Sequence, residues 1–117
     1  MEQLAALDAF FYGRDKAWEI CEALRVRLLE RWPDTQLRVM KTCISFGDPK
    51  PYAYVSLPPK KSMHGILLSV SLRESVVHPR FYRVVPVSAH RHTVHIYIES
   101  KEQIDEELLE WIERAHR

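Results

Sequence analysis

Glycine is scarce in this chain, with three residues among 117. A glycine-rich phosphate loop and a dinucleotide-binding fingerprint both need several glycines at fixed spacing, and neither pattern is present. The glycine-flanked turn that carries the serine nucleophile of many hydrolases is missing as well. The composition therefore excludes the most familiar nucleotide-binding and hydrolase motifs.

Cysteine is also rare. Cys21 and Cys43 are 22 positions apart and form no CxxC pair, which argues against a zinc ribbon and a thioredoxin-like redox site. Spacing alone leaves a disulfide open. In a reducing compartment we expect both residues to be small buried hydrophobes.

Long apolar runs are absent. The longest, residues 66–72, is interrupted by two serines, and no segment approaches the roughly 20 apolar residues that span a bilayer. Residues 1–4 lack a basic stretch followed by an apolar core, so no secretory signal is visible. We therefore expect a cytoplasmic protein without a membrane partner. The length fits a single domain over residues 1–117.

Acidic residues are few in the middle of the chain. Residues 35–98 contain nine Lys or Arg and two Asp or Glu, which gives a net charge of +7. The rest of the chain contains eight Lys or Arg and fourteen Asp or Glu, which gives a net charge of −6. A positive face concentrates anions. The alternative that acids merely favour solvated helices remains open.

Helical periodicity appears at both ends of the chain. Residues 4–11 predict a short helix that Gly13 ends, and a longer helix is expected from Asp15 to just before Pro33. Ser100 and Gln103 form a capping-box pattern, which predicts the start of a terminal helix. The apolar stripes of the two longer helices are Ala17, Cys21, Leu24 and Leu28, and Ile104, Leu108, Trp111 and Ala115.

A period of two, typical of strands, dominates between these helices. Residues 36–46 and 51–57 predict two strands of a hairpin whose turn is 47–50. Two further strands are expected at 65–72 and 93–99, with a short edge strand near 81–85. This order predicts an α+β two-layer sandwich, with helices from both chain ends on one face of four or five mainly antiparallel strands. The other face must meet solvent, a ligand or a partner.

Strand alternation assigns a polar set of side chains to that second face. Cations and an imidazole in this set could hold an anionic group through charge-assisted bonds, and tyrosine rings could stack on a planar part of a ligand. The candidate ligand-binding residues are Lys41, Tyr52, Tyr54, Arg73, His95 and Tyr97.

Three histidines occur in the stretch HRHTVHIYI. His90 and His92 share one side of a strand and His95 has the other parity, so the three cannot chelate a metal from one strand. His64 or His78 could supply a third ligand, but no HExxH helix or Cys-His spacing accompanies them. We expect no metal and no cofactor.

Four segments read FFYGRDKAWEICEAL, RVMKTCISF, PYAYVSLPP and HTVHIYIESKEQIDEELLEWIERAH. Together they resemble an uncharacterised bacterial family, filed as a domain of unknown function, with FF-x-G, K-x-x-I-x-F, F/Y-A-x-V and T-x-H motifs and a closing tryptophan-bearing helix. The likeness covers nearly the whole chain. It implies motif positions at Lys41, Ile44, Phe46 and His95, without an activity, and Tyr52 stands where the family often has phenylalanine.

Three functions fit these observations. The preferred one is a small binding module for an anionic or phosphate-bearing ligand. Single-stranded nucleic acid is one such ligand, although no RNP motif is present and a net charge of +1 argues against strong sequence-independent binding. The second is an enzyme with His95 as general acid or base and Lys41 or Arg73 stabilising negative charge. The third is an interaction surface, in a monomer or a homodimer, at the open sheet face or the edge near 81–85.

Overall fold

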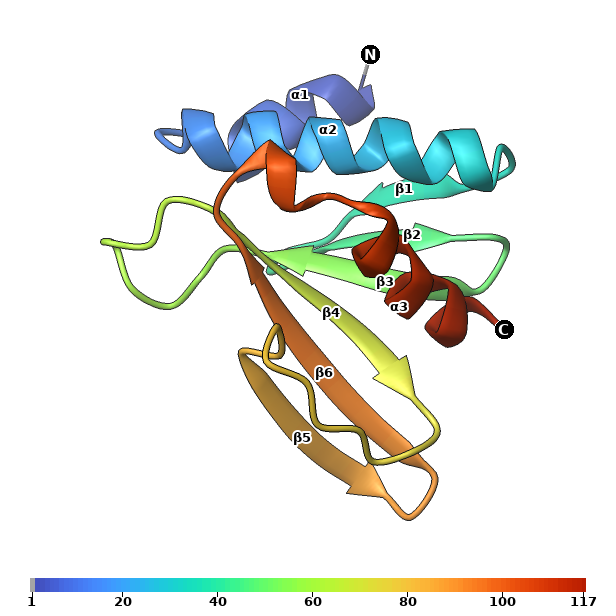
Figure 1. The fold of residues 1–117 in the computed structure, drawn as a ribbon. Helices are drawn as coiled ribbons and strands as arrows, with labels where there is room; N and C mark the ends of the chain where they lie inside the picture. The colour runs from blue at the N-terminus through green and yellow to red at the C-terminus, as the bar shows by residue number, and fades with distance from the viewer. Residues whose placement is uncertain (1) are drawn as a thin grey trace.

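The computed structural model describes residues 2–117, and Figure 1 shows their fold. Met1, part of the segment in which no secretory signal was expected, lies outside the described residues. Within 2–117, no helix combines the length and the apolar character that crossing a membrane requires. The elements are α1 (Glu2–Phe10), α2 (Asp15–Arg31), β1 (Gln36–Val39), β2 (Ile44–Gly47), β3 (Pro51–Ser56), β4 (Ile66–Leu72), β5 (Arg83–Ser88), β6 (Arg91–Ile98), the 3₁₀ turn η1 (Lys101–Gln103) and α3 (Glu106–His116).

The strands form one sheet in the order β1-β2-β3-β4-β6-β5. Every neighbouring pair is antiparallel. The β5–β6 hairpin joins the sheet through β6, which leaves β5 at one edge and β1 at the other. The predicted α+β sandwich is confirmed, with six strands in the described chain in place of the four or five expected.

The additional strand arises because a turn, which the sequence pattern did not predict, divides residues 36–47 into β1 and β2. The backbone N–H of Met40 donates to the carbonyl of Cys43 at 2.8 Å and closes a turn between β1 and β2. The single strand predicted over 36–46 is therefore wrong. No glycine or proline marks residues 40–43, so the sequence lacks the usual turn signal there.

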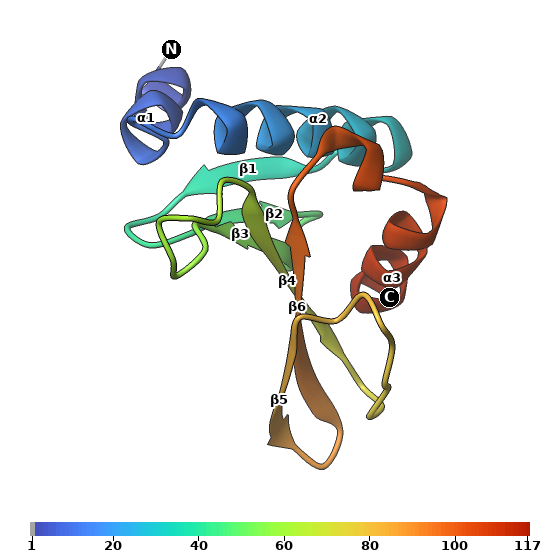
Figure 2. The ribbon, with the colours of Figure 1, turned by 60° about the vertical axis from the view of Figure 1, so that its left-hand side comes forward.

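The helices pack on one side of the twisted sheet. Figure 2 shows α2 along the top of the sheet, while α3 packs against β3 and β4 and α1 packs against β1. The predicted stripe of α2 is confirmed, since its buried residues are Ala17, Ile20, Cys21, Leu24 and Leu28. The matching row of the sheet joins Val55, Leu68 and Ile96, each at most 1% exposed.

The carboxyl-terminal helix begins later than predicted. Ser100 and Gln103 do form the expected capping box, but the turn that it starts is η1, and Ile104 leaves the helical region with φ −85° and ψ 80°. Asp105 then caps α3 by accepting a hydrogen bond from the N–H of Leu108 at 3.0 Å. Two successive caps replace the single helix start expected at Ser100.

The long segment between β4 and β5 is held against this second cap. The guanidinium of Arg80 donates to Asp105 at 2.7 Å, to Glu107 at 3.2 Å and to the carbonyl of Gln103 at 2.6 Å. The ring of His78 packs on Phe81 and Trp111. Residues 78–81 therefore belong to the helical side of the sheet.

Both cysteines are free thiols. Cys21 is 2% exposed, and burial raises the pKa of its thiol to about 12, so it is protonated at neutral pH. Cys43 is half-buried beside the β1–β2 turn. The expectation of a small buried hydrophobe is confirmed for Cys21, whereas Cys43 is only partly covered.

Candidate functional site

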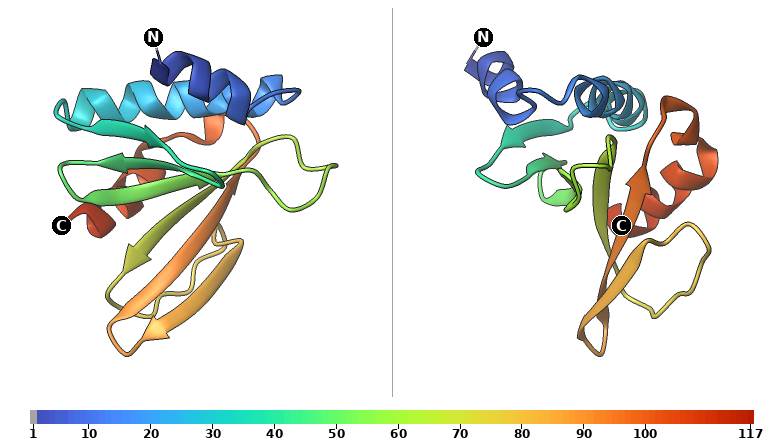
Figure 3. Two further views of the ribbon diagram at one scale, coloured as in Figure 1. Left: turned by 180° about the vertical axis from the view of Figure 1, so that it is seen from behind. Right: turned by 90° about the vertical axis from the view of Figure 1, so that its left-hand side faces the viewer.

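One face of the sheet carries no helix, and Figure 3 shows it from behind. The registers of the five strand pairs align one residue from each strand into a row across this face. We call it the lateral row. Its members, in strand order, are Arg38, Ser45, Tyr54, Ser69, His95 and Arg83.

Tyrosine rings lie on and beside the lateral row. Tyr54 belongs to it and is 36% exposed. Tyr97 lies two residues from His95 on the same side of β6, and its hydroxyl accepts a hydrogen bond from the N–H of Gly65 at 3.1 Å. The ring of Tyr82, 48% exposed, lies 6.5 Å from that of Tyr97 between centroids. The face thus offers three rings to a planar ligand.

His95 is a half-buried member of the row. Its Nδ1 lies 2.7 Å from the hydroxyl oxygen of Ser69, which fixes the ring and leaves Nε2 for a ligand. Burial lowers the pKa of His95, and the nearby charge of Arg83 lowers it further. The imidazole is therefore mainly uncharged at neutral pH and acts as a hydrogen-bonding group, while the arginines supply the charge.

This lowered pKa predicts a pH-dependent contribution to stability. The unfolded imidazole takes up a proton near its ordinary pKa of about 6.5, but the folded one resists protonation, so stability falls as pH decreases through this range. We expect His95→Gln to reduce the loss of unfolding free energy between about pH 7 and pH 5. Urea denaturation of both proteins across this pH range measures the difference.

The matched control is His90→Gln, because His90 is exposed in the turn between β5 and β6. That variant should keep the pH dependence of the parent protein. If His95→Gln also keeps it, the folded imidazole is not shielded as described. Arg83→Gln should raise the pKa of His95 in an NMR titration, since it removes the neighbouring positive charge.

Both carboxylates of residues 35–98 are paired on the helical side. Asp48 accepts a hydrogen bond from Nε2 of His116 at 3.1 Å, and Glu74 lies 3.8 Å from the guanidinium of Arg114. The lateral row contains no carboxylate. Within residues 2–117, neither Arg38 nor Arg83 forms an ion pair, so the open face has a positive potential at both ends.

The structure places half of the sequence-predicted set on the open face. Tyr54, His95 and Tyr97 lie there as expected. The expected position of Tyr52 is wrong: the residue is 5% exposed, its ring contacts Trp32 and its hydroxyl lies 2.8 Å from that of Thr35. The register shift at Phe46 and Gly47 breaks the alternation of β3, so two consecutive residues are buried.

The positions on the open face that strand alternation predicted for Lys41 and Arg73 are also wrong. Lys41 is exposed in the β1–β2 turn, and since β3 and β4 separate β2 from β6, about 14 Å of sheet lies between that strand and His95. Arg73 follows the end of β4 and donates to the carbonyl of Arg117 at 3.3 Å, which places it beside the end of α3. The two cations do not converge on His95.

Arg38 and Arg83 were missing from the predicted set. Alternation within β1 or β5 indicates which neighbours share a side, but it does not say which side faces the helices. Their membership in the row depends on pairing with Ser45 and His95. The scarcity of acids in residues 35–98 was the signal in the sequence that pointed toward them.

The histidines do not assemble into a metal centre. His92 pairs with Leu72 near one end of β4, whereas His64 precedes the other end, and His78 packs against α3. Within residues 2–117, no group of three or more His, Cys, Asp and Glu side chains is placed to hold a metal ion.

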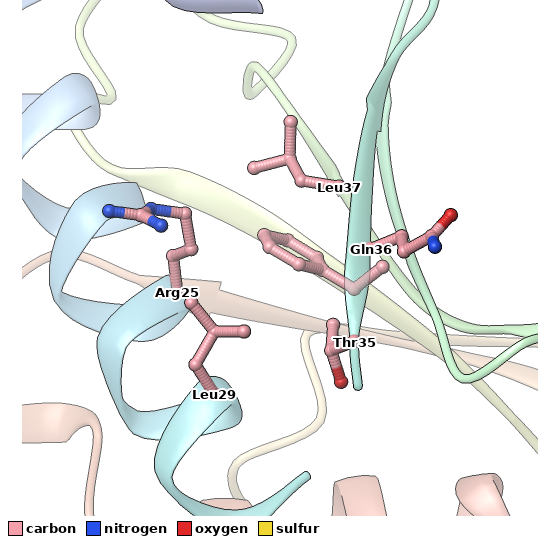
Figure 4. A pocket seen from close by; sticks show the side chains of 6 residues that line it. Arg25, Leu29, Thr35, Gln36 and Leu37 are labelled. Carbon is pink, nitrogen blue, oxygen red and sulfur yellow. The ribbon is translucent and has the colours of Figure 1, made fainter. Parts of the chain in front are cut away.

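A separate hollow of about 320 Å³ lies between α2 and β1 (Figure 4). Leu29 and Leu37 contribute apolar walls, and Arg25 lies at its edge. The guanidinium of Arg25 is engaged by Glu22, with Nε 3.0 Å from the carboxylate. This hollow is on the helical side and does not extend the lateral row.

These features define a two-layer α+β domain with an exposed basic and tyrosine-bearing sheet face. The chain belongs to the family described as Domain of unknown function (DUF5655), which it matches over residues 7–117. The predicted membership in a domain-of-unknown-function family is thereby confirmed. No curated protein and no solved structure matches the chain.

Proposed function

We propose that this domain is a binding module for a phosphate-bearing, anionic ligand on the open face of the sheet. The supporting observation is the lateral row, with an exposed arginine at each end and the phenol of Tyr54 and the imidazole of His95 between. The row also contains Ser69, whereas Ser45 is only 5% exposed. Arginine presents a planar fork of donors that suits phosphate. The face therefore combines charge with polar and aromatic contacts.

The span of the row favours an extended ligand. Neighbouring strands lie about 4.8 Å apart, so Arg38 and Arg83, on the two edge strands, are about 24 Å apart along the sheet. A mononucleotide is too short to reach both. A single strand of several nucleotides can do so, and its bases can stack on Tyr54, Tyr97 and Tyr82. Single-stranded nucleic acid is the ligand class that we propose.

Two phosphate contacts and a net charge of +1 imply modest, salt-sensitive affinity. Each single-strand phosphate contact contributes about −0.7 to the slope of log affinity against log salt, so two contacts give about −1.4. Stacking on an aromatic ring contributes about 1–3 kcal/mol per base. The rings are therefore expected to contribute as much to affinity as the charges do.

The test is fluorescence anisotropy with a labelled oligothymidine at low salt. The double variant Arg38→Gln/Arg83→Gln should weaken binding by about tenfold or more and flatten the salt slope. Tyr54→Ala should weaken binding by about five- to a hundredfold. Lys16→Gln, an exposed cation on α2, is the control and should bind as the parent protein does.

Two results would contradict the proposal. One is the absence of binding at low salt, and the other is equal binding by the double arginine variant and the parent protein. Inorganic phosphate added at a similar concentration should not displace the labelled oligonucleotide, because a phosphate ion cannot reach both edge strands.

The enzyme hypothesis has less support. A general-base histidine is commonly oriented by a carboxylate, but the ring of His95 is held by the hydroxyl of Ser69 at 2.7 Å. Pairing of two chains through β5 also has less support. That edge strand contains Pro86 and a register shift between Pro86 and Ser88, which are features that oppose edge-to-edge pairing.

A further inference from the structure

A second polar cavity lies on the helical side, away from the lateral row. It has a volume of about 370 Å³ and is formed by the β2–β3 turn, the start of β3 and the end of α3. Ligand pockets in proteins usually measure about 300–1,000 Å³. We propose that this cavity binds a compact oxyanion, such as a phosphate monoester or a carboxylate.

Three cations line the cavity. Lys50 comes from the β2–β3 turn, Arg73 follows β4, and Arg117 follows α3. One N–H group of Arg73 donates a hydrogen bond to the carbonyl of Arg117 at 3.3 Å, and the guanidinium of Arg117 donates to Glu113 at 3.2 Å. A guanidinium has five N–H donors, so both retain donors for an anion. Within residues 2–117, Lys50 makes no ion pair.

The one acidic side chain in the cavity wall is already engaged. Asp48 accepts a hydrogen bond from Nε2 of His116 at 3.1 Å, which leaves Nδ1 of the ring without a hydrogen-bond partner in the described chain. The imidazole is stacked on Trp32, with centroids 4.7 Å apart and planes 9° apart. These contacts hold the ring in place before any ligand binds, which lowers the entropy lost on binding.

Tyr52 completes the wall from β3. Its ring lies 4.7 Å from that of His116, and its hydroxyl is held by Thr35 at 2.8 Å. The cavity therefore combines cations on exposed side chains with two aromatic rings that are held in place by their own contacts. Its small volume admits a single oxyanion group and not an extended strand, so it differs from the open face in both position and ligand size.

The experiment titrates the ¹⁵N-labelled chain with inorganic phosphate, and with acetate in a parallel series. Amide shifts are expected at 48, 50, 52, 73 and 115–117. Arg73→Gln and Lys50→Gln should each weaken phosphate binding by about tenfold. The control is Lys16→Gln, which removes an exposed cation of α2 that belongs to neither proposed site and should leave phosphate binding unchanged.

Two results would overturn this inference. One is the absence of shifts at these positions with both anions, and the other is an equal loss of binding in Arg73→Gln and in the control Lys16→Gln. Stronger binding of acetate than of phosphate would assign the site to carboxylates. Thermal unfolding of Arg73→Gln checks its fold, and Lys50→Gln gives the same test at an exposed turn residue. Oligonucleotide binding by Arg73→Gln should equal that of the parent protein, so failure of one proposal does not imply failure of the other.

Discussion

Replacing Gly65 by alanine is expected to lower the free energy of unfolding by about 3–5 kcal/mol. A Cβ atom at this position would lie 1.9 Å from the carbonyl oxygen of Ile98 and 2.9 Å from the Cα atom of Glu99. Both contacts are with backbone at the end of β6, which cannot rotate away. The start of β4 would have to separate from β6, its neighbour within the sheet.

The same change also disturbs a hydrogen bond. The N–H of Gly65 donates to the hydroxyl of Tyr97 at 3.1 Å, and displacement of the backbone would lengthen that bond. Small domains have a total free energy of unfolding of about 5–15 kcal/mol. If the parent protein lies near the lower end of this range, a loss of this size leaves a substantial fraction of the variant unfolded. Urea denaturation followed by circular dichroism gives the free energy directly.

Gly13→Ala is the matched control for this prediction. Gly13 has a φ of +73°, and an added Cβ would meet nothing within 4 Å. Its substitution therefore carries only the backbone penalty of a left-handed conformation, about 1 kcal/mol. Equal destabilisation by the two variants would show that β4 and β6 do not approach each other as closely at Gly65 as described.

Leu24→Ala is expected to have the second-largest effect, a loss of about 2–5 kcal/mol. Leu24 is fully buried in the middle of the stripe with which α2 covers the sheet. Truncation removes apolar contacts and leaves a cavity that the rigid sheet beneath cannot fill. Alanine is the strongest helix former, so the helix itself is not weakened by the change. The midpoint of thermal unfolding should fall by many degrees.

Val26→Ala provides the comparison on the same helix. Val26 is 46% exposed, two residues from Leu24 and on the opposite side of the helix. A surface change of this kind usually alters stability by less than about 0.5 kcal/mol. A larger loss in Val26→Ala than in Leu24→Ala would mean that α2 presents a different face to the sheet.

Local sequence patterns predicted most of the elements because side-chain periodicity reflects which side of each element is buried. The stripe of α2 and the alternation of β4 and β6 each depend on a single buried face, and all three were predicted correctly. Errors arose where the period was interrupted, as in the turn at 40–43, which contains no glycine or proline, and at the register shift beside Gly47.

The candidate sites depend on contacts between distant parts of the chain. Alternation placed Tyr54, His95 and Tyr97 on one face, but the full lateral row required strand order and register across five pairs. The second cavity depends on a contact between Asp48 and His116, which are 68 positions apart. No local sequence pattern predicts that these two residues lie in contact.

The amino-acid sequence by itself determined the α+β class, the amphipathic face of each main element and the concentration of positive charge in residues 35–98. Only the tertiary structure decided that Arg38 and Arg83 share one row, and that Tyr52 and Arg73 lie beside α3. The physical reason is that periodicity is a property of one element, whereas register and strand order follow from burying the apolar faces of all the elements together.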